Sequence, residues 1–87
     1  MKPSRSRVQS GVGREIRRAR IAAGLTPREL GLRVERSQSW VAGVERGAQR
    51  LLAAELIEIA GALGADPAEL LAKALRLSRS RVRSGRR

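Results

Sequence analysis

Cysteine, histidine, tyrosine and phenylalanine are all absent from the 87-residue chain. Without cysteine or histidine there is no thiolate or imidazole ligand for a zinc site, no thiol or imidazole for a catalytic triad, and no disulfide bond. Most enzyme classes are therefore excluded, and we expect no catalytic residue, no metal and no cofactor. At this length only one small domain fits, and no residues remain for a domain that senses a small-molecule ligand.

Long apolar runs are also missing. The longest stretch without a charged residue, Ser37–Val44, is eight residues long, far below the roughly 20 apolar residues of a membrane-spanning helix. The basic N-terminus has no apolar segment behind it, which argues against a secretory signal. We therefore expect a cytoplasmic protein with no membrane partner.

Acidic residues are scarce beside basic ones. The chain has 19 Lys and Arg against 8 Asp and Glu, a net charge of +11. The excess lies at the ends: residues 1–20 carry +6 and residues 73–87 carry +7, whereas residues 21–72 carry −2. This density of positive charge favours an anionic partner, either nucleic acid or an anionic membrane surface.

The two ends also have little to bury. Pro3–Gln9 and Ser78–Arg87 are mostly Ser and Arg, a composition that favours disorder in an isolated chain. We interpret residues 1–11 as a flexible basic N-terminal arm and residues 77–87 as a basic, Ser/Arg-rich C-terminal tail, on either side of a domain over residues 12–76. The arms either contact DNA phosphates or only keep the protein soluble.

Between the ends, apolar periodicity and capping signals predict five helices and no strand, which is an all-α fold. Thr26-Pro27-Arg28-Glu29 and Asp66-Pro67-Ala68-Glu69 have the pattern of capping boxes with proline at the first helical position, and they open the second and fifth helices. The first helix is predicted over Val12–Ala23. Ser37 is the expected N-cap of the third helix, Gln38–Arg46. The side chains expected to face inward include Ile16, Ala19, Leu30, Val34, Val41, Val44, Leu52, Leu56, Ile59, Ala60, Leu63, Leu70, Leu71, Ala74 and Leu75.

The second and third predicted helices are joined by about three residues, which is the geometry of a helix-turn-helix. Five motifs stand in register around them: Ile16-Arg17-x-x-Arg20, Gly24-Leu25-Thr26-x-x-Glu29-Leu30, Ser37-Gln38-Ser39-Trp40-Val41, Val44-Glu45-Arg46-Gly47 and Leu56-x-x-Ile59-Ala60-x-Ala62-Leu63-Gly64. In this pattern, over roughly Val12 to Leu71, the chain resembles the DNA-binding domain of the phage repressor and Cro family, often called XRE-like. The resemblance implies a compact, lambda-repressor-like five-helix bundle with its third helix in the major groove.

The third helix carries the predicted base contacts. With Val41 and Val44 buried, its opposite face presents short or hydrogen-bonding side chains. Gln bonds an adenine edge bidentately, Ser bonds several base edges, and Ala or Gly lets the backbone approach. The alternative is an ordinary solvated face, which would more often carry Lys and Glu. The predicted base-contacting residues are Ser37, Gln38, Ser39, Ala42 and Gly43.

Four arginines are the predicted phosphate contacts: Arg28, Arg36, Arg46 and Arg50. In the family the second helix usually begins with a Gln that holds a phosphate. Pro27 stands there in this chain, and neighbouring Arg28 is expected to replace it. Arg46 and Arg50 resemble the phosphate-contacting loop that follows the family's third helix.

Two further departures from the family pattern concern the turn and the helix before it. The turn commonly has Gly and then an apolar residue, where this chain has Glu35 and Arg36. Glu is uncommon at positive φ, which predicts strain or another shape for the turn. In the second helix Gly31 replaces a small Ala and still permits close helix contact.

Trp40 and the pair Arg20 and Glu45 are the predicted scaffold residues. Trp40, the only aromatic residue, either half-covers the core or contacts the DNA backbone, and we expect partial burial. In the family the positions of Arg20 and Glu45 often form an ion pair between the first helix and the end of the third. The alternative is two unrelated surface charges, which contribute about 0 to 1 kcal/mol.

A homodimer is expected, because family members commonly dimerise and a core without Phe or Tyr is thin for a lone domain. Leu75 and Leu77, with whichever of Leu70 and Leu71 the core does not use, form the predicted dimer contact. In the alternative, the fifth helix simply continues into the tail as a solvated helix.

These observations predict sequence-specific binding of double-stranded DNA by a small transcriptional regulator, most simply a repressor that occupies an operator. Three alternatives remain. The first is the antitoxin of a toxin-antitoxin pair, which would use the same domain. The second is a nonspecific nucleic-acid-binding protein driven by the arginine-rich arms. The third is a basic peptide that binds a membrane surface.

Overall fold

The computed structural model describes residues 4–84, with side chains through residue 76. The described residues form five helices and no strand: α1 (Arg5–Ala22), α2 (Pro27–Val34), α3 (Gln38–Arg46), α4 (Ala53–Leu63) and α5 (Pro67–Ser84). The predicted all-α fold and its five helices are confirmed. None of the helices, over the described residues, combines the length and apolar content needed to span a membrane.

The first helix begins earlier than the sequence predicts. α1 starts at Arg5 rather than at Val12, with Ser4 as its N-cap, and the Ser4 hydroxyl accepts the N–H of Arg7 at 3.2 Å. Val8 packs against the core, so this turn buries an apolar side chain and has a capped end. Residues 5–11 are therefore helical rather than part of a flexible arm. The backbone of α5 likewise continues through Ser84, across most of the predicted tail.

The capping signals of α2 and α3 are confirmed. Thr26 Oγ1 accepts the N–H of Glu29 at 3.1 Å, and the Glu29 carboxylate accepts the N–H of Thr26 at 2.9 Å. Hydrogen bonding of the Glu29 carboxylate by the backbone N–H of Thr26, and then by the Thr26 side chain, holds the pKa of Glu29 below its ordinary value. At α3 the Ser37 hydroxyl accepts the N–H of Trp40 at 3.0 Å, and Gly47 ends the helix at a φ of 77°.

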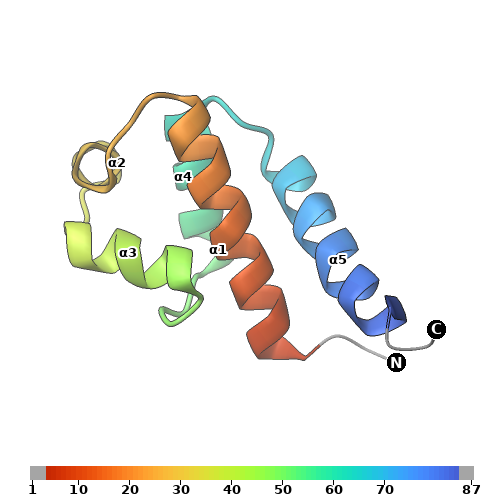
Figure 1. Cartoon of the computed structure of the whole chain (residues 1–87). Helices are drawn as coiled ribbons and strands as arrows, with labels where there is room; N and C mark the ends of the chain where they lie inside the picture. The colour runs from red at the N-terminus through yellow and green to blue at the C-terminus, as the bar shows by residue number, and fades with distance from the viewer. Residues whose placement is uncertain (1–3, 85–87) are drawn as a thin grey trace.

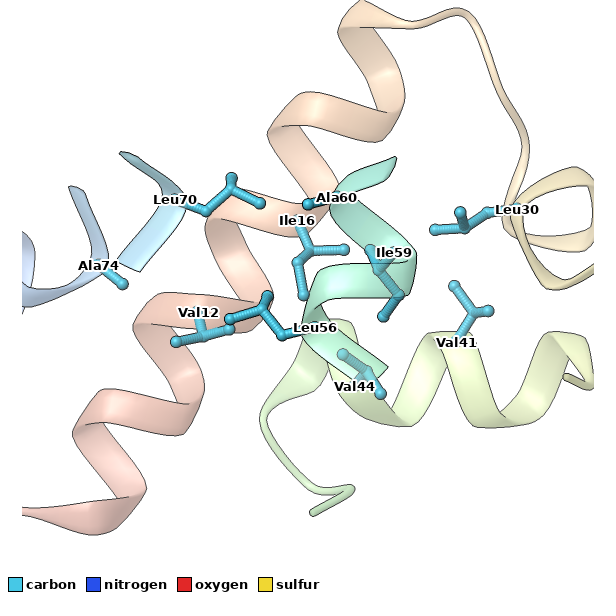
Figure 2. Close-up of a cluster of buried hydrophobic side chains, with 10 residues drawn as sticks. All are labelled: Val12, Ile16, Leu30, Val41, Val44, Leu56, Ile59, Ala60, Leu70 and Ala74. Atoms are coloured by element: carbon cyan, nitrogen blue, oxygen red, sulfur yellow. The ribbon is translucent and has the colours of Figure 1, made fainter. Parts of the chain in front are cut away.

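The helices enclose one apolar core. In Figure 1, α2 and α3 lie on one side of α1 and α5 lies on the other, with α4 behind α1. Figure 2 shows how side chains from all five helices meet between them. The buried apolar residues are Val12, Ile16, Leu30, Val41, Val44, Leu56, Ile59, Ala60, Leu70 and Ala74. Leu52 and Leu71, also expected to face inward, are instead 58% and 45% exposed.

Glycine allows α1 to cross α3 at backbone distance. A Cβ atom on Gly13 would collide with the carbonyl oxygens of Val44 and Glu45, at the C-terminal end of α3. One turn earlier on α1, Ser10 stands against Gly47, where a Cβ would lie 2.8 Å from the Ser10 hydroxyl. The end of α3 is therefore pressed directly onto α1, which fixes where α3 sits on the domain.

Candidate nucleic-acid interface

α3 turns an apolar side toward the core and a polar side toward solvent. Val41 and Val44 are buried, whereas Gln38, Ser39 and Arg46 are exposed and Ala42 is half-buried. Ser37, Gln38 and Ser39 stand together at the N-terminal end of the helix, which is the end that contacts base edges in helix-turn-helix proteins. We call Ser37, Gln38, Ser39 and Ala42 the reading surface.

Gly43 does not belong to this surface, and the prediction that it contacts a base is wrong. Gly43 is buried. Its carbonyl oxygen accepts the N–H groups of Ala48 at 2.9 Å and Gln49 at 3.1 Å, and a Cβ on Gly43 would lie 3.2 Å from the Cβ of Gln49. Helical periodicity alone places Gly43 outward, but the loop after α3 folds back and covers it.

A buried ion pair joins α3 to α1, as predicted. Arg20 Nε lies 2.7 Å from Glu45 Oε2 and Arg20 Nη2 lies 3.0 Å from Glu45 Oε1, while Arg20 Nη1 donates to the carbonyl oxygen of Leu25 at 2.8 Å. The two side chains are only 9% and 8% exposed. Hydrogen bonding to Glu45 and the charge of its carboxylate raise the pKa of Arg20, against the opposing effect of burial. The bidentate geometry fixes the direction of α3.

All four arginines predicted to contact phosphates are exposed. Arg28 lies in the first turn of α2, Arg46 in the last turn of α3 and Arg50 in the loop that follows. α2 packs against α3, and the loop that carries Arg50 continues from the C-terminal end of α3.

The fourth arginine, Arg36, is engaged within the protein. Its guanidinium forms an ion pair with Glu55 at the start of α4, and the guanidinium carbon lies 4.6 Å from the centre of the Trp40 ring. Trp40 is half-buried and packs against the core, which confirms its predicted partial burial. The sequence contains no local signal for the Arg36–Glu55 ion pair, because Glu55 lies two elements further along the chain.

Of the two forms expected for the turn between α2 and α3, strain at Glu35 or another shape, the structure has the first. Glu35 has φ 58° and ψ 45°, the left-handed region, and is the only non-glycine residue with positive φ among those described. The next N–H, of Arg36, donates to the carbonyl oxygen of Gly31 at 2.8 Å. A Cβ on Gly31 would lie 2.6 Å from the carbonyl oxygen of Arg36, so this glycine makes room for the turn itself.

An apolar face lies next to α3, and the sequence reasoning missed part of it. The exposed side chains of Leu52 and Leu71 border a cavity of about 260 Å³ that Val8, Val12, Leu51 and Leu56 also line. Ile57, on α4, is 59% exposed. Of the predicted dimer residues, Leu75 is half-buried and the side chain of Leu77 lies outside the described residues. Leu70 is buried, so Leu71 is the leucine of that pair that the core does not use.

Comparison with known proteins identifies the architecture. A family model described as a helix-turn-helix domain matches residues 12–72. The clp gene regulator ClgR from Corynebacterium glutamicum is similar at a TM-score of 0.79 and 27% identity, over 91% of this chain and 87% of that one. The restriction-modification controller protein C.AhdI from Aeromonas hydrophila is similar at a TM-score of 0.68 and 32% identity, over 71% and 90% of the two chains. No curated protein matches the sequence.

Proposed function

The chain belongs to the helix-turn-helix domain family, and from this premise we propose that it binds double-stranded DNA at specific sequences and regulates transcription as a small repressor. The observation that carries the proposal is the construction of α3. Its polar N-terminal end is exposed, while its C-terminal end is held on α1 by the buried Arg20–Glu45 pair. A rigidly held helix with an exposed polar end is what reading a major groove requires.

Base recognition is assigned to the reading surface. The carboxamide of Gln38 reaches an adenine edge bidentately, and the hydroxyl of Ser39 bonds a neighbouring base edge. Ala42, one turn further on, presents a methyl group to a thymine methyl. The Ser37 hydroxyl caps α3 by accepting the N–H of Trp40. Its own O–H group can still donate a hydrogen bond, and we assign that bond to DNA.

Phosphate contacts are assigned to Arg28, Arg46 and Arg50. All three are exposed, and contacts of this kind set the register of a protein on the duplex without carrying sequence information. Repression follows from occupancy, because a protein seated across a promoter excludes other proteins from the same groove. Such a regulator works where the chromosome is, which is consistent with the predicted cytoplasmic location.

We further propose that the protein acts as a homodimer through the exposed Leu52 and Leu71, which border the apolar cavity, together with the predicted contact residue Leu75. A single α3 reads about one half-site, whereas a two-fold dimer reads two half-sites roughly 34 Å apart. Exposed leucine side chains beside an apolar cavity are what a self-complementary contact would cover.

Selection of a preferred duplex from a random pool, followed by equilibrium binding, tests the function. Gln38→Ala should cost about 1 to 3 kcal/mol on the preferred duplex and little on random DNA. Gln49→Ala, which removes an exposed carboxamide just outside α3, serves as the matched control. Equal losses on both duplexes would remove Gln38 from the reading role, and failure to select any preferred duplex would refute the sequence-specific function.

A further inference from the structure

The helix-turn-helix unit is attached to α4 at two separate points. Near the C-terminal end of α4, Arg33 Nη1 donates to the carbonyl oxygen of Ala62 at 3.2 Å. At the N-terminal end, the Arg36 guanidinium pairs with the carboxylate of Glu55. Both arginines come from α2 and its turn, so α4 forms a brace along the unit that carries the reading surface.

The Glu55 carboxylate is itself held in place. Its Oε1 atom accepts the N–H of Leu52 at 2.8 Å and caps the start of α4, while its Oε2 atom faces Arg36. The Glu55 side chain is 12% exposed and that of Arg36 is 45% exposed. Each oxygen thus has a partner, and the carboxylate offers Arg36 a fixed anchor rather than a mobile surface charge.

The Arg36 guanidinium links the Glu55 carboxylate to α3. Its guanidinium lies over the Trp40 ring, 4.6 Å from the ring centre, in the geometry of a cation–π contact. Trp40 stands in the first turn of α3, directly after the exposed pair Gln38 and Ser39. The indole therefore connects the anchored guanidinium to the turn of α3 that carries Gln38 and Ser39.

The turn needs such an anchor. Glu35 holds a left-handed backbone conformation that costs a non-glycine residue free energy. The segment is secured locally by the bond from the Arg36 N–H to the Gly31 carbonyl oxygen. The side chain of Arg36 adds a long-range attachment at the residue that follows the strained position.

From these contacts we infer that Arg36 is a positioning residue, not a phosphate ligand. Held between Glu55 and the Trp40 ring, it sets the orientation in which α3 presents Gln38 and Ser39 to the base edges. The inference rests on the proposed DNA-binding function and replaces the phosphate contact that the sequence predicts for Arg36. Base contacts tolerate displacements of only about 0.5 Å, so a small change at this anchor affects discrimination between sequences.

Glu55→Gln is the decisive variant. Glutamine at this position of the helix still accepts the N–H of Leu52, so the cap remains while the charge that holds Arg36 is lost. A positioning role predicts that the ratio of the affinity for the preferred duplex to the affinity for random DNA falls roughly five- to tenfold, about the cost of weakening one bidentate base contact. A phosphate role predicts an unchanged ratio, because freeing Arg36 from Glu55 would strengthen binding to both duplexes alike.

Two further variants separate charge from geometry. Arg36→Gln leaves the slope of log affinity against log salt unchanged if Arg36 positions α3, but lowers it by about 0.9 if Arg36 contacts a phosphate. Arg36→Lys keeps the charge without the planar guanidinium. Under the inference it reduces the ratio of affinities for the preferred and random duplexes, whereas under a phosphate role that ratio is unchanged. Arg28→Gln is the matched control. It should lower the slope of log affinity against log salt without reducing the ratio of affinities for the preferred and random duplexes.

Gln38→Ala on the same duplexes keeps the two levels of the proposal apart. If Gln38→Ala does not reduce the ratio of affinities for the preferred and random duplexes, the proposed reading function itself fails. If Gln38→Ala reduces this ratio and Glu55→Gln does not, only the positioning role of Arg36 is overturned. Far-UV circular dichroism shows that each variant is folded. In an Arg36→Lys variant that is folded by this measure, a red shift of Trp40 emission reports the loss of the covering guanidinium even if Glu55→Gln proves unstable.

Discussion

Replacing either member of the Arg20–Glu45 pair by methionine should destabilise the protein far more than an ordinary surface substitution. The two side chains are 9% and 8% exposed and share two hydrogen bonds. Arg20→Met leaves the Glu45 carboxylate without its partner, and Glu45→Met leaves a buried guanidinium. Removing one partner of a buried pair costs about 3 to 5 kcal/mol. Because Arg20 also bonds the Leu25 carbonyl oxygen, Arg20→Met should be the more damaging of the two.

The double substitution is the informative measurement. With both charges gone, methionine side chains fill similar volume without an uncompensated charge, so the double variant should recover part of the sum of the two losses. We expect a coupling free energy of about 1 to 3 kcal/mol. A domain of this size has a free energy of unfolding of only about 4 to 13 kcal/mol, so either single variant should lower the midpoint of unfolding clearly.

Urea and thermal unfolding, followed by far-UV circular dichroism, measure the four members of this cycle. The Glu69–Lys73 pair on α5 provides the control, since its atoms are 3.5 Å apart but its side chains are 62% and 48% exposed. Its cycle should give no more than about 0.5 kcal/mol. Additive losses for Arg20→Met and Glu45→Met, or a coupling no larger than that of the control pair, would refute the scaffold role assigned to the buried pair.

The fold supports three other predictions. Gly13→Ala places a methyl group against the carbonyl oxygens of Val44 and Glu45, and it should lower the free energy of unfolding by about 1 to 3 kcal/mol; Gly61→Ala, where a Cβ meets nothing within 4 Å, is the control in the same melts. Leu52→Glu combined with Leu71→Glu should leave the protein folded but monomeric in sedimentation, and an unchanged mass would exclude this apolar face as the dimer contact. Replacing Arg79, Arg81 and Arg83 by Gln should lower the salt slope by about 0.9 for each phosphate that these arginines touch, while sequence preference survives, and an unchanged slope would mean that these cations only keep the protein soluble.

Sequence alone determined the features that depend on neighbours along the chain. The starts of α2 and α3 are set by Thr26 and Ser37, whose side chains bond backbone groups three residues away. α3 ends at Gly47 because glycine has no Cβ and adopts a positive φ readily. These bonds form within one helical turn, so they can be predicted from residues that are neighbours in the sequence. The Arg20–Glu45 pair spans 25 positions, and it was predicted from the resemblance to a known family rather than from the residues themselves.

Tertiary structure decided the features that depend on what covers a side chain. α1 reaches back to Arg5 because Val8 packs on the core, although the flanking Ser and Arg residues favour disorder. Gly43 is buried because a loop folds over it, and Leu70 rather than Leu71 is buried because of how α5 lies on α1. Nothing in the sequence distinguishes Arg36 from other exposed arginines, because its partners Glu55 and Trp40 lie beside it only in the fold. Periodicity shows which side of a helix a residue occupies, but only the packing of other elements determines whether that side meets solvent, because burial is a property of the whole assembled chain.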